Sequence, residues 1–256
     1  MTALTLIKIG GKVLDDPALL APVLNAFVAR KGPKILVHGG GKAGTDLARL
    51  LNIEAPLVAG RRITSPEMLE VALMVYGGTM NRKLVAALQA RGLDALGLTG
   101  ADLNLIRARK RPVEDLDYGL VGDIEAVNVR QLGNLLNANL VPVLAPLTHD
   151  GQGQLLNTNA DTIAATVAVA LAPYYAVELI FAFERPGVLA DAQDDGSLLP
   201  HLSRADAERH QAAGVIAAGM LPKLKNAFIA LEAGVSRVLI GRAEGGRFTG
   251  TTIELD

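Results

Sequence analysis

The sequence contains no cysteine, and this absence excludes several classes of site. Without cysteine there is no disulfide framework, no thiolate zinc site and no cysteine nucleophile. An excess of charge of one sign is also missing, because the formal net charge at pH 7 is −1. Nucleic-acid binding needs a broad basic surface, so we expect no nucleic-acid partner.

Long uninterrupted apolar runs are absent as well. The longest apolar-rich stretch, Ala160–Ala172, opens with Asp161 and Thr162, whereas a membrane-spanning helix needs about 20 apolar residues. Lys8 stands where a signal peptide would still be apolar. These observations predict a cytoplasmic protein without a membrane partner.

Half of the 256 residues are hydrophobic, enough to bury a large core as one sizeable domain or two joined lobes. Apolar β-rich runs predict strands at Leu4–Ile9, Lys34–His38, Leu93–Gly97, Leu140–Ala145, Val177–Phe183 and Val235–Ile240. Segments of helical period predict helices at Pro17–Arg30, Lys42–Leu51, Pro66–Arg91, Val129–Asn139, Asn159–Ala172, Ser203–Ala213 and Met220–Ala233.

This alternation predicts an α/β fold, a three-layer αβα sandwich around a mostly parallel open sheet. Two segments break the rhythm, Leu103–Val127 and Thr148–Leu156, and each contains a glycine turn. Both predict β-hairpins laid over the end of the sheet. We place an approximate lobe boundary near Leu171, which divides one continuous fold into residues 1–171 and 172–256.

Glycine and lysine gather in three clusters. These are Lys8-Ile9-Gly10-Gly11-Lys12, His38-Gly39-Gly40-Gly41-Lys42 and Gly219-Met220-Leu221-Pro222-Lys223. Glycine lets backbone N–H groups approach an anion, and lysine adds a movable positive charge. The first two clusters lie between a predicted strand and a predicted helix, where open α/β sheets bind ligands. Either one alone could be only a turn, but three together suggest a polyphosphate held from several sides.

The second cluster leaves another interpretation open. Gly39, Gly41 and Gly44 fit Gly-x-Gly-x-x-Gly, the fingerprint of a dinucleotide-dependent oxidoreductase. That fingerprint needs an acidic residue for the ribose after the next strand, where Gly60-Arg61-Arg62 stands instead. A Walker-type sequence is absent.

Charged residues also stand where packing alone does not require them. Arg61 and Arg62 could clamp a carboxylate, or they could be an exposed pair. Asp161 lies at the mouth of an apolar helix and needs a partner, for which lysine is the obvious choice. Lys223 lies at the start of a helix, where a cation opposes the helix dipole. Such a placement favours a functional role.

Together these segments resemble the amino-acid-kinase superfamily and, within it, the N-acetylglutamate kinases of arginine biosynthesis. The resemblance rests on Lys-Ile-Gly-Gly, Val-His-Gly-Gly-Gly, Gly-Arg-Arg-Ile-Thr, Asn-Thr-Asn-Ala-Asp and Gly-Met-Leu-Pro-Lys, in that order along the chain. It implies transfer of the ATP γ-phosphoryl group to the side-chain carboxylate of an N-acylated glutamate. It also implies that Mg²⁺ is bound mainly through the ATP phosphates, with few protein ligands.

The resemblance implies roles for particular residues. Lys8 contacts the transferred phosphoryl group, Lys223 the leaving side, and Asp161 holds both ammonium groups. The substrate's α-carboxylate is expected on Arg62, with Asn157 helping to hold it. The backbone amides of Gly10, Gly11, Gly40 and Gly41 are expected to line the path of the phosphates, and those of Gly40 and Gly41 also to help hold the substrate. Glu184 and Gly187 are expected to bind ATP. His38 is expected to support the glycine loop rather than to act in catalysis.

One departure from the family pattern concerns the nucleotide lobe, the C-terminal of the two lobes. Phe183-Glu184 replaces the usual Thr/Ser-Asp pair, so Glu184 is expected to keep only the acidic role. The acyl group is also open, because N-acetyl- and N-succinyl-L-glutamate differ by one carboxylate, and an extra cation in the acyl pocket would favour the second. A catalytically silent regulatory protein on the same fold is a further alternative.

The resemblance also concerns assembly. It makes the helix around Leu69–Tyr76 a candidate dimer interface in the N-terminal lobe, with core packing as the alternative. Arginine-inhibited members of the family have an additional N-terminal helix ahead of the first strand, through which dimers join into a hexameric ring. Only seven residues precede Lys8, so we expect a homodimer that arginine does not inhibit.

Overall fold

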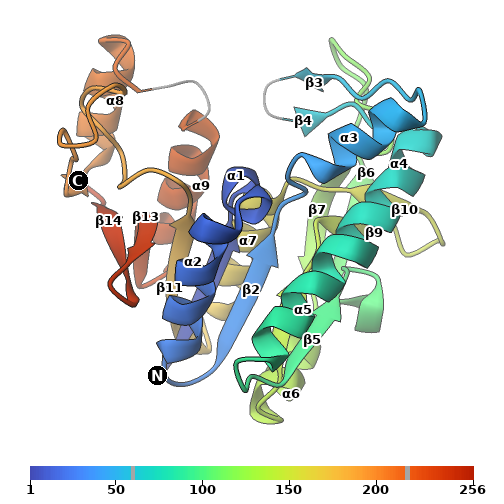
Figure 1. The fold of residues 1–256 in the computed structure, drawn as a ribbon, viewed down its shortest axis with the longest axis horizontal. Helices are drawn as coiled ribbons and strands as arrows, with labels where there is room; N and C mark the ends of the chain where they lie inside the picture. The colour runs from blue at the N-terminus through green and yellow to red at the C-terminus, as the bar shows by residue number, and fades with distance from the viewer. Residues whose placement is uncertain (59–60, 217–219) are drawn as a thin grey trace.

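The computed structural model describes residues 1–58, 61–216 and 220–256. Gly60 and Gly219, which belong to two of the motifs above, lie outside the described residues. An eight-stranded sheet runs through the molecule in the order β12-β14-β13-β11-β1-β2-β8-β5 (Figure 1). Its strands are β1 (Thr2–Ile9), β2 (Lys34–His38), β5 (Ala95–Leu98), β8 (Val141–Leu144), β11 (Tyr175–Ala182), β12 (His201–Leu202), β13 (Arg237–Glu244) and β14 (Arg247–Ile253).

Most neighbouring strands of this sheet are parallel. β1 pairs with β11 on one side and β2 on the other, and β13, β8 and β5 continue the parallel arrangement. β14 folds back antiparallel on β13, and β12 pairs with it. The carboxyl ends of β1, β2 and β11 therefore meet at one edge, where ligands bind in open α/β sheets.

Helices cover both faces of the sheet, which confirms the three-layer αβα fold (Figure 1). One core cluster joins the sheet to α6 (Val129–Asn137), α7 (Ala160–Leu171), α8 (Arg204–Ala212) and α9 (Leu221–Glu232). Another joins its opposite face to α1 (Gly11–Asp15), α2 (Pro17–Ala29) and α5 (Asn81–Gln89). A third, smaller cluster packs α3 (Ala43–Leu50) against α4 (Pro66–Ala72) and the segment that follows α4.

The alternation of side chains along β1 decides where Lys8 points. Leu4 and Leu6 belong to the cluster on the α7 side, whereas Ile7 and Ile9 belong to the opposite cluster. Because side chains of a strand alternate between the two faces, Lys8 lies on the same face as Leu6. The sequence thus directs its ammonium group toward α7.

The two predicted hairpins form one sheet rather than two separate units. β6 (Ile106–Lys110) pairs with β7 (Gly122–Val127), and β9 (Leu147–His149) pairs with β10 (Leu155–Asn157). The bridge between Arg107 and His149 joins them in the order β10-β9-β6-β7. Sequence reasoning found both hairpins but not this pairing, which has no local signal.

The predicted helix Pro66–Arg91 is continuous in extent but not uniform. α4 passes into a π-helix, η1 (Leu73–Met80), before α5 begins at Asn81. Sequence reasoning also missed several short or peripheral elements: α1, the pair β3 (Leu57–Val58) and β4 (Arg61–Arg62), the 3₁₀-turn η2 (Asp102–Asn104), the edge strand β12 and its neighbour β14.

The β13–β14 connection had a readable signal. Gly245 and Gly246 both have positive φ angles, the conformation of a two-residue hairpin turn. The lobe division at Leu171 stays a prediction; β11 and β1 of the two predicted lobes pair along their whole lengths. No helix among the described residues is long and apolar enough to cross a membrane.

Candidate active site

Two cavities open at the carboxyl ends of the central strands, and both are lined by Lys8 and Gly11. The first also has Glu184, Gly187 and Lys223 in its wall, together with an apolar lining of Phe183, Val188, Leu189, Val215, Ile216 and Met220. The second has a polar wall, which includes Gly39, Gly40, Gly41, Arg61, Arg62, Asn157, Asn159 and Asp161. A group bound in one cavity therefore meets a group bound in the other beside Lys8.

Asp161 binds two lysines at this junction. Lys8 Nζ lies 2.7 Å from one carboxylate oxygen, Oδ1, and Lys223 Nζ donates a hydrogen bond of 2.9 Å to the other, Oδ2. β1, α7 and α9 supply these three residues. Asp161 lies in the first turn of α7, where the helix dipole favours a negative charge.

Burial and charge act against each other in this cluster. Burial alone would raise the pKa of Asp161, but Lys8 and Lys223 lower it to about 2. Burial lowers the pKa of Lys8, with a further contribution from Lys223, while the Asp161 carboxylate opposes both. Asp161 is therefore ionised at neutral pH, and its negative charge allows two ammonium groups to share a buried position.

The second glycine cluster forms a tight loop between β2 and α3. Gly41 has a φ of 57°, and the carboxylate of Asp15 accepts the N–H of Lys42 with both oxygens at 2.9 Å. A side chain at Gly41 would collide with Asp15, and one at Gly40 would overlap the ring of Tyr76. Glycine is required at both positions because the neighbours leave no room for a Cβ atom.

Some backbone N–H groups of the glycine clusters donate hydrogen bonds within the chain, and others do not. Gly10 N–H donates to Ala182 O at 2.9 Å, so Gly10 does not offer the amide that sequence reasoning expected. Gly10 instead leaves space, since a Cβ there would lie 3.4 Å from that same carbonyl oxygen. The N–H groups of Gly11, Gly40 and Gly41 have no acceptor among the described residues. These three remain available to an anion.

Arg62 is buried beside the second cavity, where two of its donors are already engaged. One guanidinium nitrogen donates to Ala55 O at 2.8 Å and the other to Thr45 Oγ1 at 2.8 Å. Asn157 donates through Nδ2 to Thr64 Oγ1 at 3.0 Å. Both side chains are therefore held in place before any ligand arrives.

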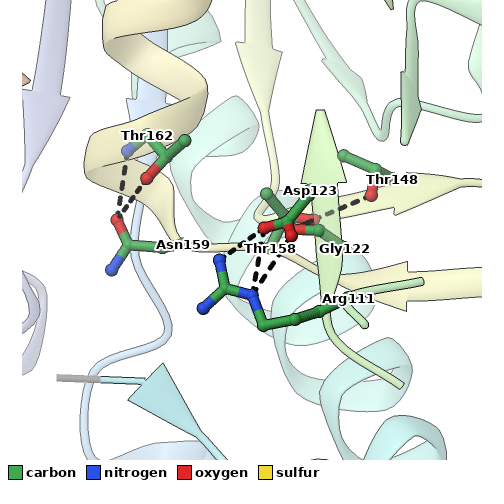
Figure 2. A network of polar contacts seen from close by, with 7 residues as sticks. All are labelled: Arg111, Gly122, Asp123, Thr148, Thr158, Asn159 and Thr162. Atoms are coloured by element: carbon green, nitrogen blue, oxygen red, sulfur yellow. Dashed lines mark hydrogen bonds and ion pairs between the residues drawn. The ribbon is translucent and has the colours of Figure 1, made fainter. Parts of the chain in front are cut away.

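Figure 2 shows the polar network beyond Asn157. The Oδ1 atom of Asn159 accepts from Thr162 N at 3.0 Å and caps α7, and its amide nitrogen points away from Thr162. Thr158 and Thr148 share a buried hydrogen bond of 2.8 Å between their hydroxyl groups. Sequence reasoning treated Asn159 only as a possible cap, but it also lines the second cavity, and its amide nitrogen donates to no other described residue.

Glu184 and Gly187, which the resemblance assigned to ATP, both line the first cavity. Glu184 forms an ion pair of 2.9 Å with the exposed Lys12. Burial would raise the pKa of Glu184, but the hydrogen bond from Lys12 and nearby positive charge keep it below its ordinary value. A Cβ atom at Gly187 would lie 2.7 Å from Thr251 Oγ1, so this glycine permits close packing of the cavity wall.

His38 is completely buried and supports the glycine loop from the interior of the protein. Its Nδ1 lies 2.8 Å from Gly39 O, and Nε2 lies 3.1 Å from Asn81 Nδ2. Because Gly39 O can only accept and Asn81 Nδ2 can only donate, the proton lies on Nδ1. Burial lowers the pKa of His38 to about 4, and the Lys8 charge contributes in the same direction.

Most of the predicted site residues therefore come together, and the structure adds others. Tyr76, Asn159 and Asp15 were not singled out for these positions, whereas Arg61 was considered only as one of a pair with Arg62. No sequence signal separates Tyr76 from the buried residues around it. Among the described residues, no group of three or more histidine, aspartate or glutamate side chains is placed to hold a metal ion.

The fold and these two joined cavities are those of a phosphoryl-transfer enzyme, and the chain belongs to the amino acid kinase family, which matches residues 3–242. The acetylglutamate kinase of Bacteroides thetaiotaomicron is 54% identical over 237 residues, covering 93% of this chain and 92% of that protein.

Two solved structures are also similar over the whole chain. The smu.665 protein of Streptococcus mutans has a TM-score of 0.83 at 30% identity, covering 99% of both chains. The N-acetylglutamate synthase of Neisseria gonorrhoeae, in complex with coenzyme A and N-acetyl-glutamate, has a TM-score of 0.82 at 25% identity. The similarity covers all of this chain and 60% of that one.

His38 predicts a pH dependence of stability. The folded ring takes up a proton near pH 4, whereas the unfolded ring does so near 6.5, so the unfolded state binds more protons between these values. The free energy of unfolding should therefore fall by about 3 kcal/mol as the pH falls from 6.5 to 4. Urea titrations of the wild type and His38→Asn across this range measure the difference. His210→Asn is the control, since the His210 ring makes no hydrogen bond or ion pair with another described residue, and a His38→Asn slope equal to that of the control would contradict the assignment.

Proposed function

We propose that the protein transfers the γ-phosphoryl group of ATP to the side-chain carboxylate of N-acetyl-L-glutamate, a step of arginine biosynthesis. The observation that carries the proposal is the junction of two cavities at Lys8, Asp161 and Lys223. The apolar first cavity suits a nucleotide, and the second, with two arginines, suits an acidic acceptor. The similarity to acetylglutamate kinases over nearly the whole chain supports the same reaction.

The acceptor needs no general base in this reaction, because a carboxylate is already ionised at neutral pH. One carboxylate oxygen attacks the γ-phosphorus, a new P–O bond forms, and the bond to the β,γ-bridging oxygen breaks to release ADP. The main obstacle is repulsion between the carboxylate and the phosphoryl oxygens. Catalysis therefore consists of positioning and electrostatic stabilisation. This requirement agrees with a junction that holds two lysines and a carboxylate, Asp161, that is paired with both of them.

In the proposal, Lys8 acts on the transferred group and Lys223 on the leaving oxygen. Asp161 keeps the two ammonium groups in position without neutralising both. The free N–H groups of Gly11, Gly40 and Gly41 donate hydrogen bonds to the phosphoryl oxygens and so also stabilise their negative charge. Mg²⁺ is held chiefly by the ATP phosphates, in keeping with its preference for few protein ligands.

The acceptor is held by the second cavity. Arg62 takes the α-carboxylate through the donors that Ala55 and Thr45 leave free. Asn157 and Asn159 contribute further amide groups from β10 and the start of α7. All three are anchored by contacts within the chain, so binding loses little side-chain freedom.

One observation favours a second candidate acceptor, N-succinyl-L-glutamate. Arg61 also lines the second cavity, and no ion pair or hydrogen bond joins its guanidinium to another described residue. The carboxylate that acts on the Arg61 charge, Asp123, is engaged by Arg111. Partial burial lowers the pKa of Arg61, and Arg111 contributes in the same direction. An additional acyl carboxylate would relieve this unmatched charge, whereas an acetyl group would not.

Neither rival from another class is supported as well. A dinucleotide site on the second cluster would place a pyrophosphate at the start of α3, where the Asp15 carboxylate already accepts the N–H of Lys42. A silent regulatory protein would have no use for a buried Asp161 between two lysines. The kinase names of the similar proteins also argue against it.

The homodimer remains part of the proposal. Of the candidate helix Leu69–Tyr76, the residues Leu69, Val71, Ala72, Val75 and Tyr76 are buried in the chain's own core. Met74 is half exposed and is the member of this segment best placed to meet a second subunit. Core packing therefore accounts for most of the apolar character of the helix.

Replacement of Lys8 or Lys223 by alanine should lower kcat by about 10²-fold or more, because the charges they stabilise develop during transfer. Steady-state assays with ATP, Mg²⁺ and N-acetyl-L-glutamate measure the change. Lys8→Arg should not restore activity, since the planar guanidinium group of arginine does not replace a compact ammonium group. The exposed Lys31→Ala serves as control. A normal kcat with only a raised KM would remove either lysine from the catalytic role.

The two arginines should differ in what they recognise. Arg62→Gln should raise the KM of both acyl-glutamates by about tenfold or more, because both carry the α-carboxylate. Arg61→Gln should lower kcat/KM for N-succinyl-L-glutamate by a similar factor and leave N-acetyl-L-glutamate almost unchanged. Parallel assays of the wild type and both variants with the two substrates decide the acyl group. Equal effects of Arg61→Gln on both substrates would show that Arg61 does not recognise the acyl group.

A further inference from the structure

The π-helix η1 interrupts a helix that would otherwise run from Pro66 to Gln89. Hydrogen bonds in a π-helix join residues five apart, so residues i and i+5 lie one above the other. In an α-helix the same two residues differ by five steps of about 100°, or about 140° around the axis. A π-helix therefore brings to one face a pair of residues that an α-helix would separate.

Tyr76 and Asn81 are five residues apart; Tyr76 contacts the loop between β2 and α3, and Asn81 contacts His38, the last residue of β2 before that loop. A Cβ atom at Gly40 would overlap the Tyr76 ring, and one at Gly44 would lie 2.6 Å from its hydroxyl oxygen. Asn81 Nδ2 lies 3.1 Å from His38 Nε2 and donates to Val143 O at 2.9 Å. Tyr76 is 4% exposed and Asn81 1% exposed, so both contacts are in the interior.

The two residues hold different parts of the same loop. Asn81 fixes His38 at the end of β2, and Tyr76 covers the glycines that follow. On the other side, Asp15 holds Lys42 N–H beside Gly41. The free amides of Gly40 and Gly41 lie between these supports and line the cavity assigned to the acceptor.

We infer that η1 serves as a positioning device, whose π geometry turns Tyr76 and Asn81 onto the glycine loop together and so orients the Gly40 and Gly41 amides for the reaction. The inference rests on the proposed function. Tyr76 and Asn81 are positioning residues, because they act on the substrates through the loop. The ring packs against glycines that have no side chain to resist movement, so removing it frees the loop.

Two single-residue deletions test this directly, because each shortens the same π segment by one residue and allows a continuous α-helix. Deletion of Gly78 places Tyr76 four residues before Asn81, and an α-helix keeps that pair on one face. Deletion of Met74 leaves them five apart and turns Tyr76 away from the loop. The two variants are otherwise matched in length and in the packing of α4 and α5.

The variant lacking Met74 should lose kcat/KM for N-acetyl-L-glutamate by about 10²-fold, the scale of a small misplacement of a catalytic group. Its KM for ATP should stay unchanged, and the variant lacking Gly78 should remain close to the wild type. Equal kinetics in the two deletion variants would overturn the inference. A wild type without phosphoryl transfer would instead overturn the proposed function and the inference with it.

Point variants keep the test open where a deletion prevents folding, as judged by circular dichroism. Tyr76→Phe retains the ring and should keep far more activity than Tyr76→Ala, which should follow the variant lacking Met74. Hydrogen exchange at the Lys42 amide, which donates to Asp15 beside Gly41, should quicken in Tyr76→Ala and not in Tyr76→Phe. Wild-type kinetics and exchange in Tyr76→Ala would contradict the role of the ring.

Discussion

The negative charge of Asp161 is the constraint on which the rest of the site depends. Two lysines from opposite ends of the chain reach the same buried point, and either ammonium alone would be costly to bury. A carboxylate with one oxygen for each lysine makes this arrangement possible. It leaves a net positive charge between the two cavities, where negative charge from ATP and a carboxylate would have to meet.

Reaching that point requires several elements to approach closely. β1 delivers Lys8 by strand alternation, α7 delivers Asp161 in its first turn, and α9 delivers Lys223. The loops around them are rich in glycine because the backbone of each loop packs closely against a neighbouring backbone or an aromatic ring. For example, a Cβ atom at Gly11 would lie 3.2 Å from Gly41 Cα. The same close packing that defines the cavities also leaves backbone amides free to bind an anion.

Sequence reasoning predicted what depends on local pattern. Strand and helix periodicity located the parallel sheet, and the unusual placement of Asp161 and Lys223 pointed to an ion pair that the structure contains. Contacts between distant segments were harder to predict. The commitment of the Gly10 amide to Ala182, the π geometry around Tyr76 and the joining of two hairpins all depend on tertiary packing. The hairpin at Gly245 and Gly246 was a local signal that the prediction overlooked.

The most direct test of the central claim is kcat for acyl phosphate formation in Asp161→Asn, trapped as the hydroxamate with ATP, Mg²⁺ and N-acetyl-L-glutamate. Asparagine keeps the size of the side chain and one acceptor oxygen but removes the charge that holds Lys8 and Lys223. The account predicts a folded protein whose kcat is lower by about 10²-fold. A kcat near that of the wild type would contradict it.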